Sequence, residues 1–462
     1  MSWTVDLLIR GGTVVTPEAT FAADLAVRDG KIVAVGTLPE PPQARQVVDA
    51  SGLQVLPGMV DPHVHIHWPF LAATSRDNFY TGTRAAALGG TTTIIDYAIQ
   101  RECHPQEAFE QRRKEVEGQA AVDYALTQVL AEHSDRTLDA IPQLMAQGVT
   151  AFKCYLIYRK RGIMVDDAML LEVLRRLREH GGLLTVHAEN AAIAEYWEAR
   201  YVREGKKDAR YFVQAKGNVV EAECINRAVY LACFVGANLY IRHISTREGT
   251  EVVGRARQAG HRIYGETCSH YLALTDEVYG RTDGFKFICS PPIKSAADRE
   301  ALWAGLRSGE LSAIGADHVA FDLAQKLEGK EAFDQVPNGL PGIETRFPVA
   351  YTEGVARGRL SLNRLVEVMS TNPAKLFGLY PRKGALLPGS DADVVLVDPS
   401  AERVLTATDL HMDVDWTPYE GMRLRGFPKV VVARGEVLVQ DGIFLGRPGR
   451  GEFLKAGLPV HC

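Results

Sequence analysis

The amino-acid sequence predicts an α/β protein: a (β/α)8 TIM barrel with a small β-sandwich domain built from both chain ends. Two observations carry this prediction. Short apolar segments alternate with longer helical patterns through the middle of the chain, and strand-like segments separated by glycine-containing turns occupy both ends. A doubly wound parallel sheet would alternate in the same way. No glycine-rich dinucleotide-binding loop follows the first apolar segment, however, which weakens that alternative.

Eight apolar segments of the middle region are the predicted strands of the barrel. Helical patterns separate most of them, for example residues 168–181 after the fourth segment and residues 219–236 before the sixth. Eight alternating strand and helix units are typical of a (β/α)8 barrel. The predicted strands span residues 59–66, 91–98, 122–130, 151–158, 183–189, 238–245, 262–269 and 312–318.

The two ends of the chain share a different pattern, in which apolar and polar residues alternate around glycine turns. LLIRGGTVVTP and ADLAVRDGKIVAVG show this pattern early, and DADVVLVDP and KVVVARGEVLVQDG repeat it late. We therefore expect one β-sandwich domain from residues 1–57 together with 386–445. Residues 58–385 form the predicted barrel, and residues 446–462 form a C-terminal tail.

Composition excludes several classes of function. The chain has 462 residues, of which 46% are hydrophobic, enough for a large barrel and a satellite domain. A net charge of −5 gives no basic footprint for nucleic acid, and no apolar run of about 18 residues predicts a membrane span. The start of the chain lacks the pattern of a signal peptide. The seven cysteines include no CxxC pair, which favours reduced thiols and a cytoplasmic enzyme.

Residues that can bind a metal fall where the predicted barrel strands end. Catalytic groups of such barrels lie at the C-terminal ends of the strands. In the segment DPHVH the two histidines are two positions apart, so both imidazoles point to one face of a strand. Imidazole and oxygen ligands without a thiolate suit zinc, with manganese or cobalt as alternatives. The candidate ligands are His63, His65, Lys153, His187, His243 and Asp317.

Each of these ligands also has a purely structural interpretation. Paired histidines on a strand, or a single buried histidine such as His187 or His243, can be ordinary hydrogen-bonded residues. Asp317 could cap a helix. Six such residues at the ends of five strands are hard to explain in that way, and their joint placement favours a metal site.

Lys153 is the most informative of the six. It lies between Phe152 and Cys154 in a strand predicted to be buried, where an ammonium group is costly to desolvate. One solution is carbamylation, in which the neutral amine adds carbon dioxide and becomes an anion that can bridge two cations. The alternative is a lysine that extends from the strand end to solvent.

An ordered set of motifs spans nearly the whole chain. It includes DPHVHIHWPF, FKCYLIY, TVHAEN, HISTREG, CSPPIK, GADHVAFD, VPNGLPGIE and NPAKLFGLYPRKGALLPGSDADVVLVDP. The set resembles the cyclic amidohydrolases, specifically their dihydropyrimidinase and hydantoinase branch.

The resemblance implies two divalent metal ions, most simply Zn²⁺, bridged by carbamylated Lys153. His63, His65 and Asp317 would bind one ion, and His187 and His243 the other. It also implies that the C-terminal tail helps to build a homotetramer, with a dimer as the alternative.

The resemblance further implies residues that act on the substrate. Tyr158 matches the tyrosine that hydrogen-bonds the substrate carbonyl, so we expect it to stabilise the developing oxyanion. Asp317 is the expected proton acceptor, which would pass the proton to the leaving ring nitrogen. Ser290 and Asn338 match positions whose backbones hold the ring amide.

The residues after the two histidines bear on the substrate. Dihydroorotases usually carry an arginine there, whereas this chain has His67-Trp68-Pro69-Phe70, which disfavours dihydroorotase. An apolar ring substituent is expected, as in 5-substituted hydantoins, with packing of a lid against the barrel as the alternative. The predicted substituent pocket consists of Trp68, Phe70, Leu71, Tyr97 and Tyr155.

The expected function is hydrolysis of the ring amide of a small hydantoin or dihydropyrimidine, which gives an N-carbamoyl amino acid. The alternatives are allantoinase or another cyclic-ureide hydrolase of the same branch, and a barrel hydrolase with a single metal. A non-catalytic dihydropyrimidinase-like scaffold protein is a more remote alternative. All six ligand positions are filled, which disfavours it.

Overall fold

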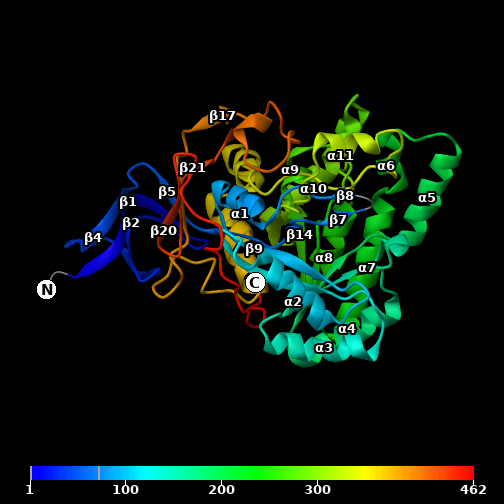
Figure 1. Ribbon diagram of the computed structural model, residues 1–462, viewed down its shortest axis with the longest axis horizontal. Coiled ribbons are helices and arrows are strands. Elements are labelled where there is room, and N and C mark those ends of the chain that lie inside the picture. Colours follow the sequence, from blue (N-terminus) through cyan, green and yellow to red (C-terminus); the bar gives the residue numbers. More distant parts are fainter. Residues whose placement is uncertain (1–2, 71–72) are drawn as a thin grey trace.

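The computed structural model describes residues 3–70 and 73–462 and has two unequal parts. A β-sheet that includes the N-terminal strands forms one end of an elongated molecule, and a larger body of strands and helices forms the rest (Figure 1). Helix α5 (Ala191–Arg203) lies at the end opposite the N-terminus.

The larger body is the predicted barrel, and all eight predicted strands are present. They run parallel, and neighbours in the chain are neighbours in the sheet. A parallel bridge between Val64 and His318 closes the ring, together with hydrogen bonds from Asp317 N to His63 O and from His65 N to His318 O, both 2.9 Å. The strands are β6 (Met59–Asp61), β9 (Thr91–Ile99), β10 (Asp123–Val129), β11 (Ala151–Tyr155), β12 (Leu183–His187), β13 (Asn238–Ile241), β14 (Ile263–Cys268) and β15 (Ala313–Gly315).

Helices follow the strands and cover the outside of the barrel. Helix α4 (Asp167–His180) shows how the sequence sets their limits: Asp166 accepts a hydrogen bond from Met169 N at the start, and Gly181 adopts a left-handed conformation at the end. Other helices are α1 (Phe79–Leu88), α2 (Pro105–Val116), α3 (Asp135–Ala146), α6 (Ala209–Ala215), α7 (Asn218–Val235), α8 (Arg247–Gln258), α9 (Ser269–Ala273), α10 (Ala296–Ser308), α11 (Leu323–Glu328), α12 (Arg346–Ala350), α13 (Leu362–Val366) and α14 (Asn372–Leu376).

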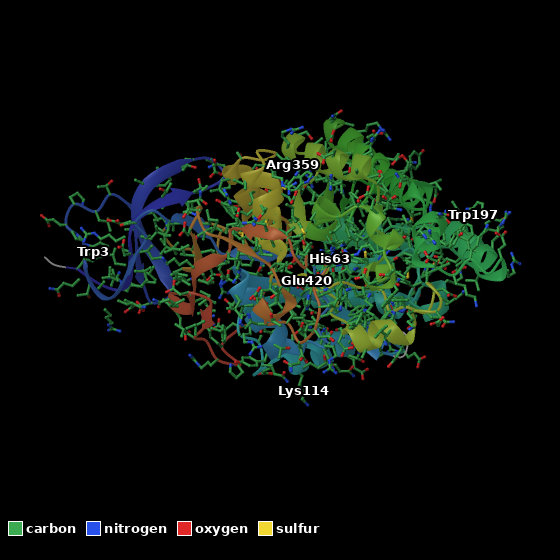
Figure 2. All side chains as sticks on the ribbon, turned by 90° about the horizontal axis from the view of Figure 1, so that it is seen from above. Trp3, His63, Lys114, Trp197, Arg359 and Glu420 are labelled. Carbon is green, nitrogen blue, oxygen red and sulfur yellow. The ribbon has the colours of Figure 1, made fainter. Side chains whose placement is uncertain are left out.

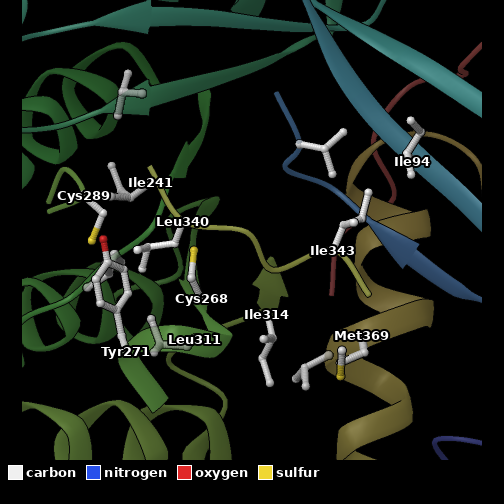
Figure 3. Packing of buried hydrophobic residues seen from close by; sticks show 14 of the residues in the cluster. Ile94, Ile241, Cys268, Tyr271, Cys289, Leu311, Ile314, Leu340, Ile343 and Met369 are labelled. Carbon is white, nitrogen blue, oxygen red and sulfur yellow. The ribbon is translucent and has the colours of Figure 1, made fainter. Parts of the chain in front are cut away.

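The strands alternate between two apolar cores because side chains on a strand point to opposite faces. On β9, Ile94 packs outward with the helices, whereas Ile95 packs inside the barrel. Figure 3 shows the outer core, where Ile94, Ile241 and Ile314 from three strands lie in the same cluster as Met369.

Both chain ends contribute to one nine-stranded sheet, as predicted. Strand β16 pairs antiparallel with β5, which places Val394 opposite Pro57 and Leu396 opposite Val55. The exact domain limits remain a prediction. The strands are β1 (Thr4–Val15), β2 (Thr20–Arg28), β3 (Lys31–Gly36), β4 (Gln43–Asp49), β5 (Gln54–Pro57), β16 (Val394–Val397), β19 (Pro428–Ala433), β20 (Glu436–Gln440) and β21 (Ile443–Phe444).

Two small two-stranded sheets were not predicted. One pairs β7 (Pro69–Phe70) with β8 (Ala73–Thr74) beside the barrel, and the other pairs β17 (Glu402–Val404) with β18 (Arg423–Arg425). The first lies in the segment that was expected to line the substituent pocket.

The C-terminal tail packs against the barrel of its own chain. Leu454 is buried and its backbone N–H donates to Tyr124 O, while Ala456 N donates to Gly148 O. The expected contribution of the tail to oligomer contacts remains a prediction. Within residues 3–70 and 73–462, no helix combines the length and the apolar character that a membrane crossing requires.

A buried ion cluster joins the barrel to the outer sheet. Lys383 Nζ lies 2.7 Å from Asp123 at the start of β10, and 2.8 Å from Asp393 and 3.0 Å from Asp391, which precede β16. Burial lowers the pKa of Lys383, but the three carboxylates outweigh burial and raise that pKa. Arg434 and Arg382 also pair with Asp123 and Asp391, but Lys383 is the buried cation that contacts all three carboxylates.

Replacing Lys383→Met should therefore lower the free energy of unfolding by about 3–5 kcal/mol, because buried carboxylates lose their counter-ion. Lys31→Met is the matched control, since Lys31 Nζ lies 2.5 Å from Asp391 but its side chain is 44% exposed. That change should cost less than about 1 kcal/mol. Denaturant titration measures both losses, and equal losses would contradict the prediction.

Candidate active site

The six predicted ligands come together at the C-terminal end of the barrel. Figure 2 places His63 within the barrel body, well away from Trp3 on the outer sheet and Trp197 on α5. Lys153 and His187 lie on β11 and β12, and the others follow the ends of β6, β13 and β15. Five of the six are buried, namely His63, His65, Lys153, His187 and His243, and Asp317 is nearly so.

One group of donor atoms consists of His63, His65 and Asp317. The two Nε2 atoms lie 3.2 Å apart, and Asp317 Oδ1 lies 3.1 Å from His63 Nε2 and 3.5 Å from His65 Nε2. Burial lowers the pKa of His65 to about 3, so its imidazole is neutral. Burial alone would raise the pKa of Asp317, but His65, His243 and Lys153 outweigh it and keep this pKa well below its usual value.

A second pair of donor atoms lies beside the first. His187 Nδ1 and His243 Nε2 are 3.1 Å apart, and burial lowers the pKa of both histidines. His63, His243 and Asp317 also form a group whose ligand atoms could hold one metal ion. The two halves of the site are therefore contiguous.

Lys153 lies between these groups with its side chain inside the barrel. Its Nζ is 4.2 Å from the centre of the Tyr97 ring and 4.6 Å from that of Tyr155. Within the described ranges it forms no ion pair or side-chain hydrogen bond. Burial lowers the pKa of Lys153 to about 7. A large fraction of neutral amine is therefore present near neutral pH, and this is the form that reacts with carbon dioxide.

Glu266 on β14 fixes the orientation of His63, and sequence reasoning missed it. Its Oε1 lies 2.6 Å from His63 Nδ1, while Oε2 accepts hydrogen bonds from Tyr240 at 2.8 Å and Arg242 at 3.1 Å. His63, Glu266 and Cys268 could hold a metal by distance. The Glu266 oxygens are already engaged, however, so this carboxylate orients a ligand instead. A lone acidic residue in an apolar strand was the available signal.

Glu189 has the same relation to His187. Its Oε2 lies 2.7 Å from His187 Nε2, accepts a hydrogen bond from Ser290 Oγ at 2.7 Å, and lies 3.4 Å from Lys216 Nζ. Lys216 and His187 outweigh the effect of burial and keep the pKa of Glu189 low. This interaction leaves His187 Nδ1 free to face the other donor atoms.

A small cavity of about 40 Å³ opens beside the donor atoms, and we call it the reaction cavity. The predicted substrate contacts Tyr158, Ser290 and Asn338 all line it. So do Trp68, Phe70 and Tyr155 of the predicted substituent pocket. Leu71 lies outside the described residues.

Tyr97 does not line the reaction cavity. Its ring stacks on His65 with the centres 4.5 Å apart and the planes at 17°, and its hydroxyl group is buried without a hydrogen-bond partner in the described part of the chain. The alternation of side chains on β9 turns Tyr97 into the barrel, behind a candidate ligand. Tyr97 packs in the same apolar cluster as Trp68, Phe70 and Tyr155, and its predicted place in the substituent pocket remains a prediction.

Residues 54–438 match the Amidohydrolase family. The chain belongs to this family. It is 39% identical over 454 residues to the D-hydantoinase of Geobacillus stearothermophilus, which is 97% of this chain and 96% of that protein. It is also 39% identical to a D-phenylhydantoinase of Escherichia coli, over 97% of this chain and 98% of the other.

Solved structures agree with this assignment. The dihydropyrimidinase of Brevibacillus agri superposes with a TM-score of 0.96 at 36% identity, over 98% of this chain and 99% of the other. The L-hydantoinase of Arthrobacter aurescens superposes with a TM-score of 0.92 at 32% identity, over 98% and 100%. The predicted branch and the prediction of a cyclic amidohydrolase are confirmed.

The site of this amidohydrolase also concentrates unusual backbone conformations. His67, Tyr158, His243 and Asp317 have φ angles of 49°, 68°, 39° and 46°. Such left-handed conformations are unfavourable for residues with a side chain, and they persist where the surrounding structure enforces them. At Tyr158, His243 and Asp317 they turn the side chains toward the reaction cavity, whereas the His67 side chain is exposed.

Tyr97 and Tyr240 are both buried inside the barrel but differ in their hydrogen bonds. Tyr240 donates to Glu266, whereas the Tyr97 hydroxyl group has no partner in the described residues. Tyr97→Phe removes a hydroxyl group without a partner, so the free energy of unfolding should stay within about 1 kcal/mol of the original or rise. Tyr240→Phe removes a donor from Glu266 and should cost about 1–3 kcal/mol. Thermal and chemical unfolding measure both, and a larger loss for Tyr97→Phe would contradict the assignment.

Proposed function

We propose that this amidohydrolase opens the ring amide of a hydantoin or dihydropyrimidine with the help of two divalent metal ions. The observation that carries the proposal is the set of imidazole, carboxylate and amine groups that converge beside the reaction cavity. Relatives named D-hydantoinase and a structure named dihydropyrimidinase support the substrate class. The reaction adds one water and breaks the ring C–N bond, which yields an N-carbamoyl amino acid.

The donor set suits metal ions. Neutral histidines offer lone pairs, Asp317 stays ionised, and the acceptors behind His63 and His187 fix which ring nitrogen faces the site. His63, His65 and Asp317 would hold one ion, and His187 and His243 the other. Carbamylated Lys153 would bridge them. Zinc suits nitrogen and oxygen ligands, with manganese or cobalt as alternatives. When bound, such ions polarise a carbonyl oxygen and lower the pKa of water.

The residues of the chain would perform the proton transfers and hold the substrate. Asp317, ionised and at the edge of the cavity, would accept the proton of the attacking water and deliver it to the ring nitrogen as the C–N bond breaks. Tyr158 would donate a hydrogen bond to the developing oxyanion, because burial raises its pKa and keeps its proton in place.

Ser290 and Asn338 would hold the ring. The Ser290 hydroxyl group is already engaged, since it donates to Glu189 and accepts from Lys216 at 2.5 Å. Its backbone therefore remains for the substrate amide. Asn338 lines the same cavity and would complete the contact.

Turnover of a panel of cyclic ureides tests the proposed function. The metal-replete protein should hydrolyse hydantoin, dihydrouracil or 5-substituted hydantoins, and the two enantiomers of each substituted compound give its stereochemical preference. Hydrolysis of allantoin alone would instead identify an allantoinase. No hydrolysis of any member, with about two metal ions bound per chain, would refute the proposal.

We also propose a homotetrameric assembly in the cytoplasm, with a dimer as the alternative. All seven cysteines are free thiols, which suits a reducing compartment. Light scattering coupled to size exclusion measures the assembly, and a monomer at micromolar concentration would contradict it.

Removal of the bridging group should abolish activity. Lys153→Ala deletes the only amine that faces both groups of ligands in the described residues, so turnover should fall by at least about 10³-fold. A short carboxylic acid such as propionate should partly restore turnover, because its carboxylate can occupy the vacated position. Lys114→Ala, at an exposed position of helix α2, is the control. Full turnover of Lys153→Ala without added acid would contradict the bridging role.

The carboxylate behind His187 should control metal affinity. Glu189→Gln keeps the shape but weakens the interaction that orients His187, so metal affinity should fall about 10–100-fold. Chelator competition and elemental analysis measure this change independently of activity. Glu195→Gln is the control, because Glu195 pairs with Arg159 on the surface of α5. Equal affinities for the two variants would refute the positioning role of Glu189.

A further inference from the structure

We infer that Arg161 and Arg101 form a subsite for a ring substituent that ends in a carboxylate. The inference rests on the proposed function and deepens it, because it names the class of substrate: cyclic ureides with an acidic side chain. It differs from the expectation of a purely apolar substituent.

Arg161 reaches the reaction cavity from a short turn, Arg159–Arg161, between Tyr158 and Gly162. Both flanking residues have φ angles of 68°, which reverses the chain tightly and brings Arg161 back over the cavity. Its guanidinium carbon lies 4.2 Å from the centre of the Phe70 ring and 4.9 Å from that of Tyr158. A cationic group therefore lies among the residues that line the cavity.

Arg101, in the loop after β9, meets Arg161 in an outer cleft beside the reaction cavity, which Arg101 does not itself line. Its Nη2 donates to Pro69 O at 3.4 Å, and Arg161 Nη2 donates to that same oxygen at 3.2 Å. Two guanidinium groups thus converge on one neutral acceptor. Burial lowers the pKa of Arg101, and the positive charge of Arg161 lowers it further.

Among the described residues, no carboxylate neutralises these two cations. In the part of the chain that the structure describes, neither arginine has an acidic group within 4.0 Å, whereas neighbouring Arg159 pairs with Glu195 at 3.3 Å. Glu102, Glu132 and Lys160 line the outer cleft beside the two arginines, and no ion pair joins the glutamates to them. Each arginine makes one hydrogen bond to the protein and keeps further N–H donors for a ligand.

This arrangement fits a carboxylate on a short apolar stem. Phe70 and Tyr155 line the reaction cavity and would contact the stem. The planar guanidinium group of Arg161 matches a carboxylate in bidentate geometry. Arg161 and Arg101 repel each other, and this repulsion is larger near a protein surface than in bulk water. A bound anion would reduce it.

The test compares two substrates that differ in one charge: 5-(2-carboxyethyl)hydantoin and its neutral isostere 5-(2-carbamoylethyl)hydantoin. The ratio of their kcat/KM values should favour the acid by at least about tenfold, as expected for a charge-assisted hydrogen bond. Arg161→Gln should reduce this ratio to near one, and Arg101→Gln should reduce it in part. Arg159→Gln removes the same charge from the same turn and should leave the ratio unchanged.

The outcomes separate the two proposals. A ratio of one or less in an enzyme that hydrolyses hydantoins would overturn the anionic subsite and leave the proposed function standing. If neither compound is hydrolysed, calorimetric binding of the same pair to the metal-replete protein decides the subsite. Tighter binding of the acid that Arg161→Gln abolishes would support it, and equal affinities would overturn it.

Discussion

Lys153 has its amine inside a parallel barrel, among aromatic rings and histidines, with no carboxylate paired to it in the described residues. An ammonium group in that position would cost several kcal/mol of desolvation. Burial therefore shifts the lysine toward its neutral form, and the neutral form is the nucleophile that carbamylation needs. The same desolvation keeps the surrounding histidines neutral and able to donate lone pairs. The chemistry of the site follows from the exclusion of water from the end of the barrel.

The two halves of the site are built in the same way. A histidine in each half contacts a buried carboxylate, Glu266 or Glu189, and a buried cation compensates that carboxylate in turn. Arg242 performs this task for Glu266, and Lys216 performs it for Glu189. These charges lie outside the set of candidate ligands. They nevertheless decide which nitrogen of each histidine ring is available to a metal. The geometry of the donor atoms therefore depends on the ion pairs that lie behind the candidate ligands.

Sequence reasoning found the architecture and the candidate ligands because both depend on short-range periodicity. Alternation along the strands identified the barrel, and a lysine in an apolar strand pointed to a bridged metal site. It could not assign Glu266 and Glu189 their partners, because those contacts join strands that are distant in sequence. It also could not show that the Tyr97 ring stacks on His65, because the direction of a side chain within a barrel depends on register. The cavity-facing position of Arg161 depends on two left-handed residues whose conformations the sequence does not reveal.

The pairing of β5 with β16 has a consequence for biosynthesis. The early strands leave the ribosome first, yet the edge of β5 gains its partner only after the entire barrel has been translated. At ordinary rates of translation the interval is on the order of tens of seconds. During that time an unpaired strand edge is open to association with other nascent chains. Lys383 also cannot meet Asp123 before that moment. The outer sheet and its junction with the barrel can therefore close only late in synthesis.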